Sequence, residues 1–306
     1  MRLLFAVLLV TILVPGIGSA QEESQPAAVP AQAPEPTGPA AFVQFLGSAT
    51  PLGTVMVSNL NLGYDLTPHI GFDAGLPVFS VRSPFSLVTN HDWRWSDLWG
   101  DPYLDARYTT TRYGFKVNSI LTVTFPGSTD LRIFTTGRVG GDWYNHLEHG
   151  SYWRFTPFVN FGAANGTIDR YVTPRPYEIA RPYRTLGLTS DFEGGTNLRL
   201  VRGFRLGGSA YGLVPAGPQK VFSRLVAPDN PLASDGNHNR YFDAAFETIG
   251  PSKIARDNGV SGWLEITRFR NFTLQFGYTR SGHYAYDAYT FMLRFDGTSL
   301  IRGFLQ

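Results

Sequence analysis

The feature that most limits how this chain can fold is an alternation of apolar and polar residues, which begins near residue 41 and continues almost to the C-terminus. Its period of two is the side-chain period of a β-strand. In the segment 272–279 the apolar positions are Phe272, Leu274, Phe276 and Tyr278. An apolar face opposite a charged face fits a soluble sandwich, where the apolar face is the core. It also fits a membrane barrel, where the apolar face meets lipid and the charged face lines the lumen.

The spacing of the alternating segments favours the barrel. We expect twelve strands, near residues 41–48, 54–65, 68–81, 101–113, 114–126, 130–144, 152–165, 185–199, 203–214, 259–270, 271–283 and 288–297. Short connections alternate with long ones over most of the chain, and the long ones fall at 82–100, 166–184 and 215–258. Short turns on one rim, long loops on the other and an even strand count are typical of outer-membrane proteins. The sequence therefore predicts an all-β, transmembrane, antiparallel up-and-down barrel of about twelve strands within residues 41–306.

The N-terminal region predicts export. Residues 1–20 combine Arg2, a short apolar run and small residues before Gln21, which is the pattern of a signal peptide cleaved after Ala20. The alternative is a membrane anchor, but the run is shorter than the roughly 20 residues that a spanning helix needs. Residues 21–40 are rich in Pro and Ala and predict a periplasmic linker. We therefore expect the protein in the bacterial outer membrane.

Composition narrows the function classes. Charged residues are 16% of the chain, against about 25% in a soluble domain, and aromatic residues are 14%. Lys and Arg number 26 against 24 Asp and Glu, which leaves no basic footprint for nucleic acid. No glycine-rich nucleotide loop is present and there is no Cys, so we expect no cofactor and no disulfide framework. The expected partners are outer-membrane lipid, lipopolysaccharide, the barrel-assembly machinery and a small-molecule solute.

The predicted lumen face carries charges of both signs. They are Asp73, Asp105, Arg107, Lys116, Arg132, Arg138, Asp142, Arg154, Asp191, Glu193, Arg199, Arg205, Glu265, Arg294 and Asp296. Opposite charges in a narrow interior are expected to pair across strands. Two interpretations stay open: structural filler that holds the barrel in shape, and a polar constriction that selects small solutes. The candidates for lining the lumen, chosen because they fall mid-strand, are Arg132, Arg138, Asp191, Glu193 and Arg294.

Aromatic residues suggest two further features. The loop 82–100 contains Trp93, Trp95 and Trp99, which are candidates for lining the entrance for an aromatic or lipidic ligand. The same loop fits a surface against lipopolysaccharide or a self-packed cap. Other aromatics near predicted strand ends fit girdles at the membrane boundaries or plain β-propensity: Tyr64, Tyr103, Tyr108, Trp143, Tyr144, Trp153, Trp263 and Tyr278.

Two groups of residues contain side chains that are common in metal sites and in hydrolase active sites. His146 and His149 fall in an expected periplasmic turn, but no third ligand is evident, so we expect no metal site. Ser281, His283 and Asp287 form the only grouping that resembles a hydrolase site. Because such groupings arise often by chance in polar loops, no catalytic residue is predicted and the protein is not expected to be an enzyme.

Two segments resemble a known bacterial family. Gly100-Asp101-Pro102-Tyr103-Leu104-Asp105-Ala106-Arg107-Tyr108 and the strand from Phe115 to Phe125-Pro126-Gly127 are similar to outer-membrane transporters named for the meta-cleavage pathway of phenol degradation. The layout is similar over about residues 50–297, although residues 296–306 continue past the aromatic end of the last strand. The resemblance implies a channel or uptake role for small, hydrophobic or aromatic solutes, and it carries no site residue. A structural or adhesive barrel with a filled lumen and a barrel hydrolase stay open as alternatives.

Overall fold

The computed structural model describes residues 37–50, 53–82, 96–127, 138–150, 154–166, 169–180, 183–217, 219–223, 248–250, 256–269, 271–283 and 285–305. The expected signal peptide and all but the end of the expected linker lie outside the described residues. The described residues after position 36 belong to one compact unit, which contains the whole barrel.

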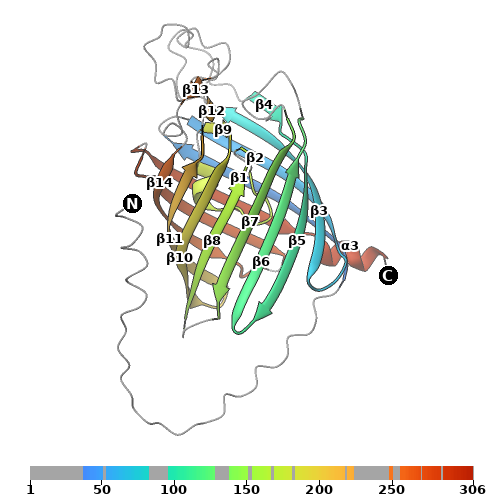
Figure 1. The fold of residues 1–306 in the computed structure, drawn as a ribbon. Helices are drawn as coiled ribbons and strands as arrows, with labels where there is room; N and C mark the ends of the chain where they lie inside the picture. The colour runs from blue at the N-terminus through green and yellow to red at the C-terminus, as the bar shows by residue number, and fades with distance from the viewer. Residues whose placement is uncertain are drawn as a thin grey trace, which may run out of the picture. The chain divides into compact units, whose positions relative to one another are not determined.

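Twelve antiparallel strands form a closed barrel (Figure 1). They are β1 (Gly38–Thr50), β2 (Gly53–Asp65), β3 (Ile70–Arg82), β5 (Tyr103–Arg112), β6 (Phe115–Thr124), β7 (Gly140–His149), β8 (Phe155–Ala164), β10 (Thr189–Val201), β11 (Phe204–Pro215), β14 (Asp257–Ile266), β15 (Phe272–Ser281) and β16 (Asp287–Asp296). Each strand pairs with the preceding and following wall strands, and β1 pairs with β16 to close the circle. The predicted twelve-stranded up-and-down barrel is confirmed.

The remaining elements lie between or after the wall strands. The strand β4 (Ser96–Trp99) pairs with β3, while β9 (Tyr183–Leu186), β12 (Gln219–Ser223) and β13 (Thr248–Gly250) form a separate small sheet. The helix α2 (Pro176–Ala180) follows β8, and the helix α3 (Thr298–Leu305) follows β16. Among the described residues, no helix is long and apolar enough to cross a membrane.

The wall is apolar outside and polar inside. On β2, Leu60, Leu62 and Tyr64 are each more than half exposed, whereas Asn59 and Asn61 between them are almost fully buried. The same alternation occurs on most wall strands. A soluble β-protein buries its apolar face, because removing apolar surface from water drives folding. The inverted arrangement is that of a transmembrane barrel, whose outer face meets lipid.

Short turns and both described chain ends lie on one rim, which we call the short-turn rim. Its turns join β2 to β3, β5 to β6, β7 to β8, β10 to β11 and β14 to β15. In the turn at Tyr113-Gly114 both residues have positive φ, 52° and 77°, which is the geometry of a tight type I′ hairpin. The opposite ends of the wall strands are joined through the long connections 83–102, 125–139, 165–188 and 216–256 and through the short connections 51–52 and 282–286. The predicted alternation of short and long connections therefore holds over most of the wall, and the connections 51–52 and 282–286 are the exceptions.

Three boundaries differ from the sequence prediction. The seventh strand begins at Gly140 rather than near residue 130, and residues 128–137 lie outside the described part. The first strand begins at Gly38, three residues earlier than expected, because its pairing with β2 extends to Gly38 opposite Asp65. After β16 the chain forms the helix α3, whereas the sequence suggested either a tail or a continuation of the last strand.

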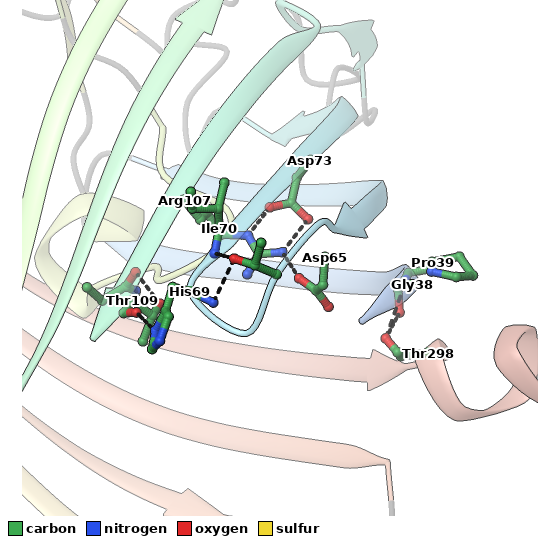
Figure 2. Close-up of polar contacts among 12 residues, drawn as sticks. Gly38, Pro39, Asp65, His69, Ile70, Asp73, Arg107, Thr109 and Thr298 are labelled. Carbon is green, nitrogen blue, oxygen red and sulfur yellow. Dashed lines mark hydrogen bonds and ion pairs between the residues drawn. The ribbon is translucent and has the colours of Figure 1, made fainter. Parts of the chain in front are cut away.

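A polar network ties the chain ends to the short-turn rim. Figure 2 shows Arg107 pointing toward both Asp73 and Asp65, and its Nη2 lies 3.0 Å from Asp65. The second carboxylate oxygen of Asp65 lies 3.0 Å from Arg302 of α3, and Arg302 also donates to the carbonyl oxygen of Pro39 at 2.8 Å. Asp65 therefore links β5 to the C-terminal helix, and Arg302 links that helix to the start of β1.

The neighbouring glycines of β11 give a matched test of the inner wall. A Cβ at Gly207 would overlap the ring of Trp263, whereas a Cβ at Gly208 would have Ser261 O as its nearest neighbour, at 3.9 Å. We expect Gly207→Ala to lower the free energy of unfolding by about 1–3 kcal/mol, the usual cost of overpacking. Gly208→Ala should be neutral or raise it slightly, because Gly weakens strands. Urea unfolding in detergent measures both variants, and equal effects would contradict the packing of Trp263 over Gly207.

Candidate functional site

A stretch of chain after β8 lies inside the barrel rather than outside it. We call residues 169–180, which include α2, the inward segment. Pro176 occupies the first helical position of α2, where a missing N–H costs nothing. Glu178 reaches back to accept a hydrogen bond from the Arg175 backbone N–H at 3.1 Å, which is half of a capping box. The local sequence thus favours one short helical turn at this place.

Arg170 of the inward segment is a buried charge at the centre of a cluster of ion pairs. Its guanidinium lies 2.7 Å from Asp142 of β7, 2.8 Å from Asp191 of β10 and 2.5 Å from Glu178 of α2. All four side chains are less than a tenth exposed. Burial alone would lower the pKa of Arg170, but the three carboxylates hold it well above its usual value. Arg170 therefore stays charged and joins the segment to two wall strands.

A second arginine anchors the segment toward the short-turn rim. The Nε of Arg175 lies 2.7 Å from Glu193 of β10, whose side chain is fully buried. The guanidinium carbon stacks 4.6 Å from the ring centre of Phe158 on β8 and 5.1 Å from that of Trp263 on β14. A desolvated guanidinium over aromatic faces is a favourable contact. Arg175 thus holds the segment against three further points of the wall.

Aromatic stacking completes the contacts of the inward segment. Tyr171 stacks on Tyr103 of β5 with ring centres 5.1 Å apart, inside an apolar cluster that includes Phe79. Tyr177 stacks on Tyr211 of β11 with centres 4.4 Å apart, and its hydroxyl donates to Asp191 at 3.3 Å. Burial, with Asp191 and other carboxylates nearby, raises the pKa of the Tyr177 hydroxyl well above its usual value. Tyr177 therefore remains a hydrogen-bond donor at neutral pH.

These contacts carry the inward segment across the lumen. They reach seven wall strands, because Arg294 of β16 also donates to the carbonyl oxygen of Val172 at 2.9 Å. The strands reached are β5, β7, β8, β10, β11, β14 and β16. The lumen is thus narrowed near its middle by a segment that is held on most sides.

Between the inward segment and the short-turn rim lies a cavity of about 620 Å³, which we call the vestibule. Its roof is formed by Val172, Thr173, Pro174 and Arg175, and its walls come from β6, β7, β10, β11, β14, β15 and β16. Its charged lining residues are Lys116, Glu148, Arg175, Arg205, Glu265, Arg294 and Asp296, accompanied by amide, hydroxyl and aromatic side chains. A chamber of this size accommodates a small molecule.

Three of the five lumen-lining candidates lie in the interior. Asp191 and Glu193 are buried beneath the inward segment, where they accept from Arg170 and Arg175. Arg294 lines the vestibule. Arg138 was expected mid-strand, but it lies exposed in the connection before β7 and donates to the carbonyl oxygen of Asn165. Arg132 lies outside the described residues.

Of the three tryptophans predicted to line the entrance, the structure describes only Trp99. Trp93 and Trp95 lie outside the described residues, and Trp99 ends β4 with its side chain 62% exposed. The proposed aromatic girdle needs a correction, because Tyr103, Tyr144 and Trp263 are buried and face the lumen. Tyr64, Tyr108, Trp143 and Tyr278 do lie exposed on the wall, whereas Trp153 is outside the described part.

The histidine expectations also need correction. His146 and His149 lie within β7 rather than in a turn, and residues three apart on a strand face opposite sides. His146 contacts Asn160 at 2.6 Å inside the barrel, whereas His149 packs edge-on against Phe115. The residues of the hydrolase-like grouping are also separated by the wall. Ser281 is buried and donates a hydrogen bond to Asp257, whereas Asp287 forms an ion pair with the exposed Arg280.

Sequence patterns alone did not single out Arg170, Arg175, Tyr171 and Tyr177. They lie in the long connection predicted at 166–184, for which the sequence left open a place inside or outside the lumen. The only signal in the sequence was composition. The stretch 169–180 contains two arginines, two tyrosines and two prolines within twelve residues, and it lacks the Gly and Ser that would make a flexible loop. No periodic pattern marks such a segment, because its contacts are to strands distant in sequence.

No family model and no curated protein sequence matches the chain. Among solved structures, the COG4313 outer membrane channel from Pseudomonas putida F1 has a similar fold, with a TM-score of 0.53 and 11% identity over 91% of this chain and 100% of that chain. A KdgM porin (TM-score 0.46, 6% identity, 83% and 98% covered) and the CymD monoaromatic hydrocarbon channel (0.39, 7%, 85% and 88%) are weaker likenesses. The first of these shows that the barrel fold is shared.

Proposed function

We propose that this protein is an outer-membrane channel for small solutes, whose lumen is narrowed by the inward segment. The observation that carries the proposal is the vestibule, a polar chamber that reaches from the short-turn rim to the roof residues 172–175. A barrel with a merely structural role has no need of a chamber lined by charged and amide groups. In a channel, such groups replace part of the hydration shell of a passing solute.

The proposed location follows from the wall and the rims. The apolar outer face fits contact with outer-membrane lipid, and short turns in such barrels face the periplasm. The vestibule therefore opens to the periplasm, and the opposite rim of the barrel faces the cell exterior and its lipopolysaccharide. Recognition by the barrel-assembly machinery and cleavage of the signal peptide after Ala20 belong to the same proposal.

The lining favours polar solutes over hydrocarbons. The vestibule lining includes the charged residues Lys116, Glu148 and Arg205 among many other polar groups, and its aromatic members are Trp263, Phe269 and Phe272. Moving an apolar molecule past such charges gains nothing from desolvation and disturbs their hydration. Aromatic solutes suit the chamber when they carry a polar or charged group.

A second candidate function is a structural or adhesive barrel with a filled lumen. The observation that favours it is the anchoring of the inward segment by Arg170, which is paired with three buried carboxylates. Such pairs are costly to break, so this segment would not move aside easily. The two candidates differ in one measurable property, which is whether ions pass through the folded barrel.

Single-channel recording with a thiol label tests the channel proposal. Because the chain contains no Cys, Thr273→Cys introduces a single thiol in the vestibule wall. We expect stable conductance steps from the unmodified protein, and a smaller conductance after Thr273→Cys reacts with a bulky thiol reagent. The label would fill part of the ion path.

The matched control is Tyr113→Cys, which places the thiol in an exposed turn of the short-turn rim, outside the vestibule lining. Labelling this variant should leave the conductance unchanged. A folded barrel without any conductance would favour the filled-lumen function. Equal effects of the two labels would contradict a path through the vestibule.

A further inference from the structure

Nearly all the charged side chains that line the vestibule have an ion-pair or hydrogen-bond partner. Lys116 lies 3.8 Å from Glu148, and Arg205 lies 3.6 Å from Glu265. Asp296 accepts a hydrogen bond from the backbone N–H of Thr298 at 2.9 Å, at the start of α3. The three carboxylates of the vestibule therefore already have partners, two of them cations and the third a backbone donor.

Arg294 is the exception among the vestibule cations. Its guanidinium donates one hydrogen bond, from Nη1 to Val172 O at 2.9 Å, and stacks 3.7 Å from the ring centre of Phe42. Within the described part of the chain, no carboxylate lies within ion-pair distance of Arg294, since Asp296 and Asp73 act on it only from farther away, and its Nε and Nη2 donate no hydrogen bond. A desolvated guanidinium without an anion is unfavourable, whereas its planar donors match a carboxylate well.

Further unused donors lie on the same roof. In the described structure, Nη2 of Arg175 and the hydroxyl of Thr173 are buried without a hydrogen-bond partner, and both residues line the vestibule. Thr273 lies directly across from Arg294 on the neighbouring strand, and Gln275 follows on the same face. The roof of the vestibule thus offers two guanidinium groups and neutral polar groups, but no unpaired carboxylate.

We propose that the vestibule binds small organic carboxylates, with Arg294 as the main anchor of the carboxylate group. This inference rests on the proposed channel function and narrows its solute class to organic anions. The guanidinium of Arg294 would take the carboxylate through its unused donors, while the chamber of about 620 Å³ holds the rest of the molecule. Phe42 beneath the guanidinium fixes its plane, which reduces the entropy lost on binding.

Calorimetric titration of the full-length barrel in detergent tests the inference, with benzoate as the probe and benzamide as its uncharged counterpart. We expect benzoate to bind and benzamide to bind much more weakly. Arg294→Gln should weaken benzoate binding about tenfold or more, the usual effect of removing a hydrogen bond to a charged group. The matched control Arg205→Gln removes a vestibule arginine that already has an acidic partner, so it should change the affinity by about twofold or less.

A second variant supplies the missing partner instead of removing the anchor. Thr273→Glu places a carboxylate directly across from Arg294, and we expect it to abolish benzoate binding while heat-modifiable gel migration shows a folded barrel. Equal losses in Arg294→Gln and Arg205→Gln, or equal binding of benzoate and benzamide, would overturn the inference. Because calorimetry does not require ion flow, conductance without benzoate binding refutes only this inference, whereas binding without conductance refutes the channel proposal.

Discussion

Replacing Arg170 with Met is expected to release the inward segment and to raise the single-channel conductance. The substitution leaves three buried carboxylates without their cation, on Asp142, Asp191 and Glu178. Removing one partner of a buried ion pair costs about 3–5 kcal/mol. The barrel wall is held by its own strand pairing, so the cost should fall on the segment and open the lumen. Conductance in planar bilayers and protease cleavage within residues 169–180 measure this result.

The control for this variant is Arg112→Met, at an exposed site beside the turn at Tyr113. It removes the same charge from the chain but leaves the lumen unchanged, so conductance and protease resistance should match those of the unmodified protein. Conductance unchanged in Arg170→Met, with a folded barrel, would show that Arg170 does not hold the segment in place.

A compensated variant separates lost packing from uncompensated charge. Combining Arg170→Met with Asp142→Asn, Asp191→Asn and Glu178→Gln removes the whole charged cluster. Neutral groups of similar shape tolerate burial better than unpaired carboxylates. We expect the combined variant to recover part of the protease resistance of the inward segment. No recovery would indicate that the geometry of the Arg170 guanidinium, rather than charge balance, determines the position of the segment.

Placing an arginine at Val159 is expected to destabilise the folded barrel in lipid by about 2–4 kcal/mol. Val159 lies in the middle of β8, is 53% exposed and pairs with Leu147 and Gly194 of the neighbouring strands. In lipid, a guanidinium at this depth must leave water or distort the bilayer. In a water-soluble protein, the same change at a half-exposed valine would have little effect. Unfolding in lipid vesicles by urea measures the difference.

The depth control is Leu66→Arg, in the turn between β2 and β3 on the short-turn rim, where the side chain is also more than half exposed. Near the membrane boundary the expected cost is only about 0–1 kcal/mol. A cost at Val159 no greater than that at Leu66 would contradict a lipid-facing wall. The two substitutions together therefore test the orientation of the barrel wall without any assumption about the solute.

The fold could be predicted because its signal is local. On β2 the period of two assigns Leu60 and Leu62 to one face and Asn59 and Asn61 to the other. In the structure the two leucines are exposed on the outer face and the two asparagines are buried on the inner face. Segment lengths and short turns such as Tyr113-Gly114 then gave the strand count and the two rims. Boundaries were less certain where no alternation marks them. The start of β7 at Gly140 and the helix α3 after the last strand show this.

The candidate site could be predicted only in part. Alternation was enough to put Asp191, Glu193 and Arg294 on the inner face, because a strand residue's face depends on its own position alone. Their partners did not follow, since Arg170 and Arg175 belong to a segment without periodicity, and the sequence left open whether that segment lies inside or outside the barrel.

Thus the sequence by itself determined the wall of the barrel, its polarity and its rims, because each depends on residues that are neighbours along the chain or across one hairpin. Only the tertiary structure decided that residues 169–180 enter the lumen and that Arg170 joins Asp142 and Asp191. It also decided that Arg294 lines a chamber in which no carboxylate of the described residues lies within ion-pair distance of it. These contacts join residues far apart in the chain, and what selects them is the pairing of buried charges once the closed wall excludes most water.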